Sequence, residues 1–154
     1  MFPGGFTPTF GGNITDTALT VGTKGEFKEG VFADVLYDFT GSVGRNESTY
    51  IMTNTINASL GPDTPTEFSP GKYIQLEKTF TADFVKYVGV GLYEDLTVAF
   101  GTQWTEETFE VVAGDVASFI DGPLTEQGFG IGSNGFPGFK PEDGGVNSRR
   151  NYAF

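Results

Sequence analysis

The stretch Phe84 to Trp104, FVKYVGVGLYEDLTVAFGTQW, decides the fold class of this 154-residue chain. On both sides of a polar turn at Glu94-Asp95, apolar residues alternate with small or polar ones. The alternating apolar residues are Val88, Val90 and Leu92 before the turn and Leu96, Val98, Phe100 and Trp104 after it. Successive side chains of a β-strand point to opposite faces, so this period of two predicts an antiparallel hairpin with one half-buried face.

Other parts of the chain show the same alternation, between segments rich in glycine and proline. The further strand candidates are 14–21, 31–39, 49–60 and 72–80. Gly41 to Gly44 is predicted to be a turn, and Gly61 to Gly71, which contains three prolines, a loop. Short strands at this spacing indicate an all-β fold, and we expect a β-sandwich or jelly-roll-like antiparallel domain.

The segment Thr105 to Ile120 admits two interpretations. Its apolar residues fall at helical spacing, and Thr105 followed by two glutamates is a reasonable helix start. However, Gly114-Asp115 lies in the middle and β-branched residues are frequent. We favour a strand, a turn at Ala113 to Asp115 and a second strand, and keep the helix as the alternative.

The net charge and the length of the chain argue against several classes of function. A chain of 154 residues is most simply one domain with its own core. Its net charge is −11, and nine Lys and Arg residues are too few and too scattered to follow a phosphate backbone, so we expect no nucleic-acid partner. The acidity also opposes binding to anionic membranes, and no apolar run approaches the ~20 residues of a membrane helix. The first residues lack the pattern of a secretory signal, so we expect synthesis in the cytoplasm.

Histidine and cysteine are both absent, which removes Ser-His-Asp and Cys-His catalysis as well as zinc sites. Asp34 and Asp38 share a predicted strand face, but four residues separate them by roughly 13 Å, too far for a glycosidase pair. Acidic loop residues are the remaining calcium candidates, without an EF-hand pattern. These residues are Asp63, Asp121, Glu142 and Asp143. We expect no enzymatic activity, no cofactor and no metal.

Both ends of the chain combine glycine, proline and phenylalanine. We predict an N-terminal arm at residues 1–12, a β-sandwich domain at 13–122 and a C-terminal arm at 123–154. The proline and glycine content of FPGGFTPTFGG excludes a helix there. The aromatic residues that we expect to anchor the arms are Phe2, Phe6 and Phe10 at the start and Phe129, Phe136 and Phe139 near the end.

The final residues, SRRNYAF, add Tyr152 and Phe154 to the predicted partner-binding set. Arg149 and Arg150 either dock on an acidic patch of a partner or belong to a solvated terminus. Aromatic residues isolated between glycines seldom fold onto their own core, so we expect a neighbouring subunit to supply the surface for the arms. A C-terminal loop packed on its own domain is the alternative.

In overall character the chain resembles the decoration, or cement, proteins of tailed-phage heads. The resemblance covers its small size, its acidity, the missing cysteine and histidine, and the segments FPGGFTPTFGG and GFGIGSNGFPGF. It implies a virion structural protein on the capsid exterior, a homotrimer or other homo-oligomer that bridges major capsid proteins. A component of a tail or connector ring is a close alternative. A carbohydrate-binding β-sandwich, using Trp104, Tyr87 or Tyr93 to stack on sugars, is the alternative from another class.

Overall fold

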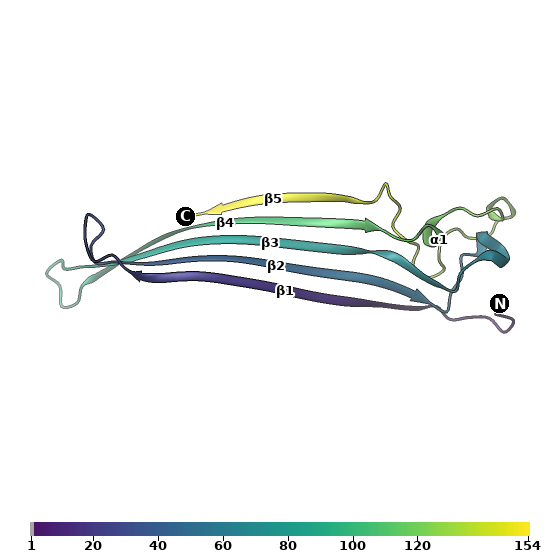
Figure 1. Ribbon diagram of the computed structural model, residues 1–154, viewed down its shortest axis with the longest axis horizontal. Helices are drawn as coiled ribbons and strands as arrows, with labels where there is room; N and C mark the ends of the chain where they lie inside the picture. The colour runs from purple at the N-terminus through teal and green to yellow at the C-terminus, as the bar shows by residue number, and fades with distance from the viewer. Residues whose placement is uncertain (1) are drawn as a thin grey trace. The chain divides into compact units, whose positions relative to one another are not determined.

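The computed structural model describes residues 2–154 and contains one antiparallel sheet (Figure 1). Its strands are β1 (Thr9–Glu26), β2 (Val35–Thr53), β3 (Glu67–Val88), β4 (Leu96–Ala113) and β5 (Gly145–Ala153). They lie in sequence order, β1-β2-β3-β4-β5, so every strand pairs with its neighbour in the chain. The prediction of an all-β antiparallel fold is confirmed.

The predicted hairpin at Phe84 to Trp104 is formed by β3 and β4, but its turn is longer than expected. Strand β3 ends at Val88, and the loop that follows includes Gly91 in the left-handed region, with φ of 78°. Val90 and Leu92, predicted as strand residues, lie in this loop and are exposed. Glycine tolerates positive φ without strain, so the turn begins near the glycines and includes the acidic pair.

Strand β2 differs from the prediction at both ends and in its middle. It begins at Val35 rather than Val31, because Gly30 and Asp34 have positive φ and form the turn from β1. The predicted turn at Gly41 to Gly44 is wrong, since these residues lie inside β2 between two paired neighbours. The predicted strand 49–60 ends at Thr53, and a 3-10 helix, η1 (Ala58–Asp63), follows.

The segment Thr105 to Ile120 combines both interpretations. Strand β4 continues to Ala113, and the predicted turn then leads to a single helical turn, α1 (Val116–Phe119), rather than a second strand. The Asp115 carboxylate accepts a hydrogen bond from the Ser118 backbone N–H at 2.8 Å, which caps α1. A second 3-10 turn, η2 (Thr125–Gln127), lies further along.

The second sheet of a sandwich is not among residues 2–154, because all five strands belong to one sheet. The two predicted arms also contain strands. Thr9 to Gly12 is the start of β1, and most of the final ten residues form β5 at the edge of the sheet. Met1, the first residue of the predicted N-terminal arm, lies outside the described residues.

The chain divides into two compact units, each built from parts of all five strands. Unit 1 comprises the described part of Met1–Asp16 together with Asn46–Gln75 and Phe109–Asn147. It holds η1, α1, η2 and the long connection from β4 to β5. Its buried side chains are apolar at Met52, Phe68 and Pro70 and polar at Thr55, Asn57, Ser59, Thr64, Ser118 and Ser133.

Unit 2 comprises Thr17–Arg45, Leu76–Thr108 and Ser148–Phe154. It consists of strands and the β1–β2 and β3–β4 loops. Of its described residues only Val35 and Ala82 are buried, each with 6% of its surface exposed. Unit 2 is therefore a single layer of sheet with almost no interior of its own.

Candidate binding surfaces

Three of the predicted anchor residues pack within unit 1. Phe10 on β1 stacks on Tyr50 with ring centroids 5.4 Å apart and also contacts Phe136 at 5.1 Å. Phe139 contacts Tyr73 at 5.0 Å and Tyr50 at 6.3 Å. The glycine-rich segment thus folds back on its own sheet, as in the packed-loop alternative. Binding of these residues to a partner stays a prediction.

A buried polar network fastens the β4–β5 connection to η1 in unit 1. The Asn57 amide group donates to the carbonyl oxygens of Ala117 and Ile120 at 2.9 and 3.0 Å. Its Oδ1 accepts from the Ser59 hydroxyl at 2.6 Å, and the Gly122 N–H donates to that hydroxyl at 2.9 Å. Among the described residues no buried side-chain polar atom lacks a hydrogen-bond partner, so this polar interior is satisfied.

Two glycines allow the connection to approach the rest of unit 1 closely. A Cβ atom at Gly122 would overlap the backbone of Ser59. A Cβ atom at Gly138 would overlap the Ser118 side chain. The Gly138 N–H donates to the backbone carbonyl oxygen of Ser118 at 2.9 Å. Close packing against backbone explains part of the high glycine content of this segment.

The other predicted aromatic anchors make no described ring contact with the sheet. Phe2 and Phe6 contact each other, with ring centroids 5.2 Å apart. Phe129, which follows η2, keeps 48% of its surface exposed. Tyr152 on β5 is 65% exposed, and Phe154 just after β5 is 98% exposed.

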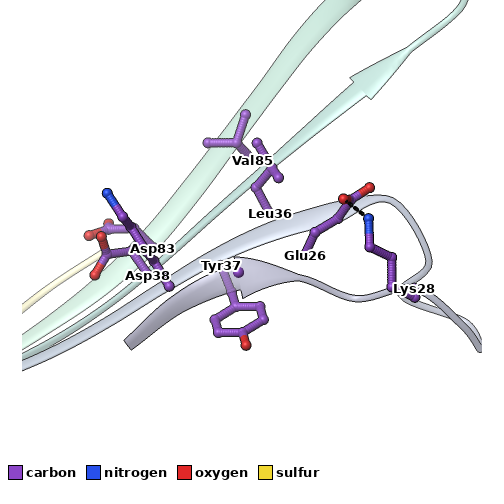
Figure 2. Close-up of a pocket in the computed structure, with 9 residues that line it drawn as sticks. Glu26, Lys28, Leu36, Tyr37, Asp38, Asp83 and Val85 are labelled. Atoms are coloured by element: carbon purple, nitrogen blue, oxygen red, sulfur yellow. Dashed lines mark hydrogen bonds and ion pairs between the residues drawn. The ribbon is translucent and has the colours of Figure 1, made fainter. Parts of the chain in front are cut away.

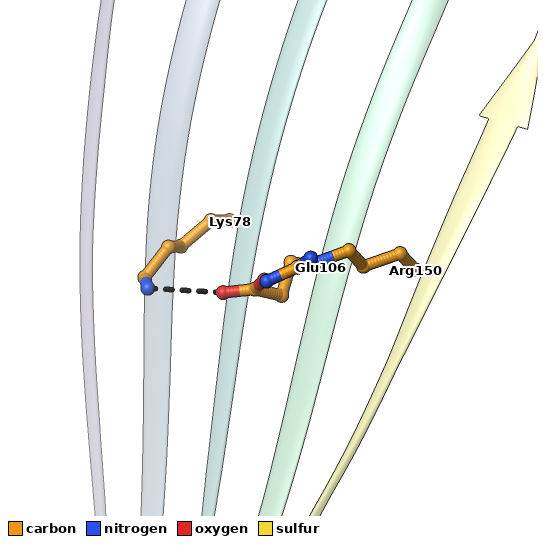
Figure 3. A network of polar contacts seen from close by, with 3 residues as sticks. All are labelled: Lys78, Glu106 and Arg150. Carbon is orange, nitrogen blue, oxygen red and sulfur yellow. Dashed lines mark hydrogen bonds and ion pairs between the residues drawn. The ribbon is translucent and has the colours of Figure 1, made fainter.

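The two predicted arginines form ion pairs within unit 2. The Arg150 Nε donates to a Glu106 oxygen at 2.6 Å, and Lys78 donates to the other oxygen of Glu106 at 3.2 Å (Figure 3). Arg149 pairs with Glu107 in the same way. The hydrogen bond from Arg150, and then that from Lys78, lowers the pKa of Glu106, while the pKa of Arg150 is raised. These pairs join edge strand β5 to β4, and binding to an acidic patch of a partner stays a prediction.

The ring contacts in unit 2 show which residues share a face of the sheet. Phe39, Phe84 and Phe100 form a row across β2, β3 and β4, with centroid separations of 5.6 and 5.0 Å. Lys78 on β3 and Glu106 on β4 pair in the same register as Phe84 and Phe100, so these four residues share one face of the sheet. Alternation along each strand then assigns the residues between them to this face or to the opposite one. We call this side the apolar face. Its large apolar residues are Leu19, Val21, Val35, Tyr37, Phe39, Val43, Leu76, Phe80, Phe84, Val88, Leu96, Val98, Phe100, Trp104 and Tyr152.

Many of these side chains are in contact with water. Leu19 and Val21 on β1 are 62% and 66% exposed, and Phe100 on β4 is 58% exposed. Phe80, on the central strand β3, is 47% exposed. Unit 2 thus presents an apolar sheet surface that no other layer among residues 2–154 covers.

The opposite side, which we call the polar face, carries most of the carboxylates of the unit 2 strands. A Cβ atom at Gly101 would meet the Asp83 side chain, so these two residues share it. On this face a groove of about 540 Å³ runs over Leu36 and Val85, with Asp38 and Asp83 at one end (Figure 2). Lys28 pairs with Glu26 at its other end, while the Tyr37 ring points away. The groove is shallow and open, with an apolar floor and acidic margin.

The three aromatic residues considered for sugar stacking lie on different surfaces of unit 2. Trp104 is half-buried on the apolar face, as its alternation with Phe100 predicts. Tyr87 is 55% exposed. It lies on the polar face, because it is an odd number of residues from Phe84 on the same strand. Tyr93 lies in the β3–β4 loop and is fully exposed. They do not form one stacking platform.

The acidic residues considered for metal binding have other surroundings. Within residues 2–154 no three His, Cys, Asp or Glu side chains are grouped to hold a metal ion. The Asp143 carboxylate accepts from the Lys140 N–H at 2.9 Å, and Glu142 pairs with the Lys140 amine at 3.6 Å. Asp34, at φ of 62°, belongs to the β1–β2 turn rather than to a strand with Asp38. Of the described helices, none has the length and apolar character to cross a membrane.

Comparison with protein-family models, with curated proteins and with solved structures gave no match. The surfaces described above therefore carry the functional argument by themselves. The sequence predicts the alternating apolar residues of β2, β3 and β4 but not that they form an exposed surface. The same alternation is expected for the interior of a sandwich.

Proposed function

We propose that this chain is a non-enzymatic structural subunit of a protein assembly, and that the assembly is a virion. The observation that carries the proposal is the apolar face of unit 2. Exposed apolar patches of this kind mark interaction surfaces in soluble proteins. The absence of histidine and cysteine from the sequence supports a structural rather than a catalytic role.

The capsid role comes from the resemblance to decoration proteins. In this proposal the chain binds the outside of a capsid and bridges neighbouring subunits through aromatic residues near its ends. Phe154, Tyr152, Phe10 and Phe129 are 98%, 65%, 52% and 48% exposed. Because Phe10 packs on Tyr50 and Phe136, and Tyr152 lies on the apolar face, the proposal favours Phe129 and Phe154 as anchors. Phe10, Phe136 and Phe139 contact one another or neighbouring rings and contribute to the fold of unit 1.

Sedimentation of the purified chain with capsids stripped of accessory proteins tests the proposal. We expect the chain to pellet with the particles and to raise the temperature at which they lose their contents. The double variant Phe129→Ala and Phe154→Ala should bind at least tenfold more weakly. A matched control, Tyr93→Ala, removes an exposed aromatic side chain from the β3–β4 loop and should bind like the wild type.

A deletion in the predicted N-terminal arm tests the anchors Phe2 and Phe6, and it should spare the folded part of that segment. Because β1 begins at Thr9 and Phe10 packs on Tyr50, we would remove only residues 1–6.

A chain that stays in the supernatant with every capsid preparation, and is retained by a polysaccharide column, would replace the proposal with the carbohydrate-binding alternative.

A further inference from the structure

We propose that the apolar face of unit 2 is the contact between two copies of this chain, packed face to face about a two-fold axis. The inference deepens the proposed function, because it names the first partner in the assembly. It rests on three observations: the size of the exposed apolar surface, the distribution of charge between the two faces, and the single-layered sheet.

The exposed apolar surface has the size that a stable dimer needs. Phe80, Phe100 and Tyr152 are 47%, 58% and 65% exposed, and Leu19, Val21, Leu96 and Val98 are between 42% and 66% exposed. With ordinary side-chain areas, these seven residues leave roughly 400–700 Å² of apolar surface in water. A standard interface buries about 800 Å² per partner, including its polar rim. The apolar face therefore supplies the centre of such an interface.

Most carboxylates of the unit 2 strands lie on the polar face, which a face-to-face pair would leave outside. At the strand positions of unit 2, the polar face carries five carboxylates and the apolar face one, Glu106. The five are Glu26, Asp38, Glu77, Asp83 and Glu107. Glu106 is already paired with Lys78 and Arg150. The apolar face also carries the cations Arg45, Lys78, Lys86 and Arg150, so a face-to-face pair would turn five of the six strand carboxylates of unit 2 outward and bring these cations to the contact.

A second copy also completes the architecture that the alternation requires. An antiparallel sheet with one apolar face normally packs that face on another layer, about 10 Å away in a β-sandwich. Here the second layer is not supplied by residues 2–154. A two-fold axis lets each sheet cover the other with the same residues, so one patch serves both partners. The row Phe39, Phe84 and Phe100 lies on β2, β3 and β4, the three inner strands, and would form the middle of the contact.

The wild-type chain provides a test that needs no variant. Trp104 is the only tryptophan and lies half-buried on the apolar face. We expect a native mass of two copies, by sedimentation equilibrium, that falls to one copy on dilution. Over the same concentration range the Trp104 emission should shift to longer wavelength and become more accessible to acrylamide. A chain that remains monomeric up to about 1 mM, a concentration at which weak specific pairs are visible, would overturn the inference.

Two variants on one strand separate the two faces. Phe80→Lys places a charge on the apolar face, and Tyr87→Lys places the same charge on the polar face at a position that is 55% exposed. An unpaired charge buried in a contact is strongly unfavourable, so Phe80→Lys should raise the dissociation constant of the dimer at least 100-fold. Tyr87→Lys should leave the dissociation constant within about threefold. Circular dichroism of both variants at low concentration checks that the sheet is retained.

Other outcomes would count against the face-to-face pair. Equal weakening by both variants would exclude the apolar face as the contact, and so would a stable trimer without dimers. If Phe80→Lys does not fold, the concentration dependence of Trp104 in the wild type still decides. A monomeric wild type that pellets with capsids would reject this inference and leave the proposed function intact, whereas a dimer that ignores capsids would do the reverse.

Discussion

The two units share the same five strands but cover them differently. In unit 1 the connection from β4 to β5 returns to the sheet, and Phe136 and Phe139 pack on Tyr50 and Tyr73. In unit 2 the corresponding strands have no such segment, and rings such as Phe100 remain exposed. A sheet face needs a cover, and the chain supplies one in unit 1 only. The difference separates residues that stabilise the fold from residues that are available to a partner.

The largest effect should follow from preventing the connection of unit 1 from closing. Gly122→Ala would place a methyl group against the Ser59 backbone, which cannot move without disrupting η1. We expect the free energy of unfolding to fall by about 3 kcal/mol or more. Gly130→Ala is the matched control, because a Cβ atom there meets nothing within 4 Å, and its effect should stay within about 0.5 kcal/mol. Urea denaturation measures both, and equal effects would contradict the close approach.

The next largest effect should come from the polar network that fastens the same connection. Asn57→Ala leaves the part-buried carbonyl oxygens of Ala117 and Ile120 without their donor, and the buried Ser59 hydroxyl without its acceptor. Because unpaired buried groups are costly, we expect a loss of about 2–3 kcal/mol in unfolding free energy. Asn134→Ala changes an exposed asparagine in the same connection and should be nearly neutral. A neutral Asn57→Ala would show that the network does not hold the connection.

A third prediction compares one aromatic residue from each unit. Phe139→Ala removes a ring that contacts Tyr50, Tyr73 and Phe136, and should lower the unfolding free energy of the isolated monomer by about 2 kcal/mol. Phe100→Ala removes a ring whose one described ring contact is Phe84, and should lower it by about 1 kcal/mol. Thermal denaturation at concentrations where the wild type is monomeric measures both. The reverse order would mean that unit 2 depends on its apolar face for its own stability.

Alternation was enough to predict the fold class but not the number of layers. The period of two in Leu96, Val98 and Phe100 correctly placed these residues on one face. It could not tell whether the cover for that face comes from the same chain or from another, because both require the same pattern. The sandwich prediction assumed the first possibility, and the strand order shows one sheet instead.

The positions of the turns and the packing of the predicted anchor residues depend on strand pairing and tertiary contacts, which a local sequence pattern does not specify. Gly41 and Gly44 look like turn residues, yet pairing on both sides keeps them in β2. Phe136 and Phe139 look like isolated aromatic residues between glycines, yet Gly138 lets their segment lie against Ser118. The ion pairs of Arg149 and Arg150 likewise required the register of β5 on β4, which the sequence alone does not specify.

The smallest predicted effect concerns the charge cluster of Glu106 in unit 2. Since Arg150 and Lys78 hold the pKa of Glu106 below its ordinary value near 4.5, the folded state favours the ionised carboxylate. Its contribution to stability is therefore fully present above pH 4.5 and is lost as the pH falls through the lowered folded pKa. Glu106→Gln should lower the melting temperature slightly at pH 7, and the difference from the wild type should vanish below that pKa. At pH 7 it should also shrink in 1 M salt, because the cluster is exposed to solvent. Glu94→Gln, in the β3–β4 loop, removes the same charge outside the cluster and should leave the melting temperature at pH 7 unchanged. A pH-independent difference for Glu106→Gln would mean that the cluster acts by packing rather than by charge.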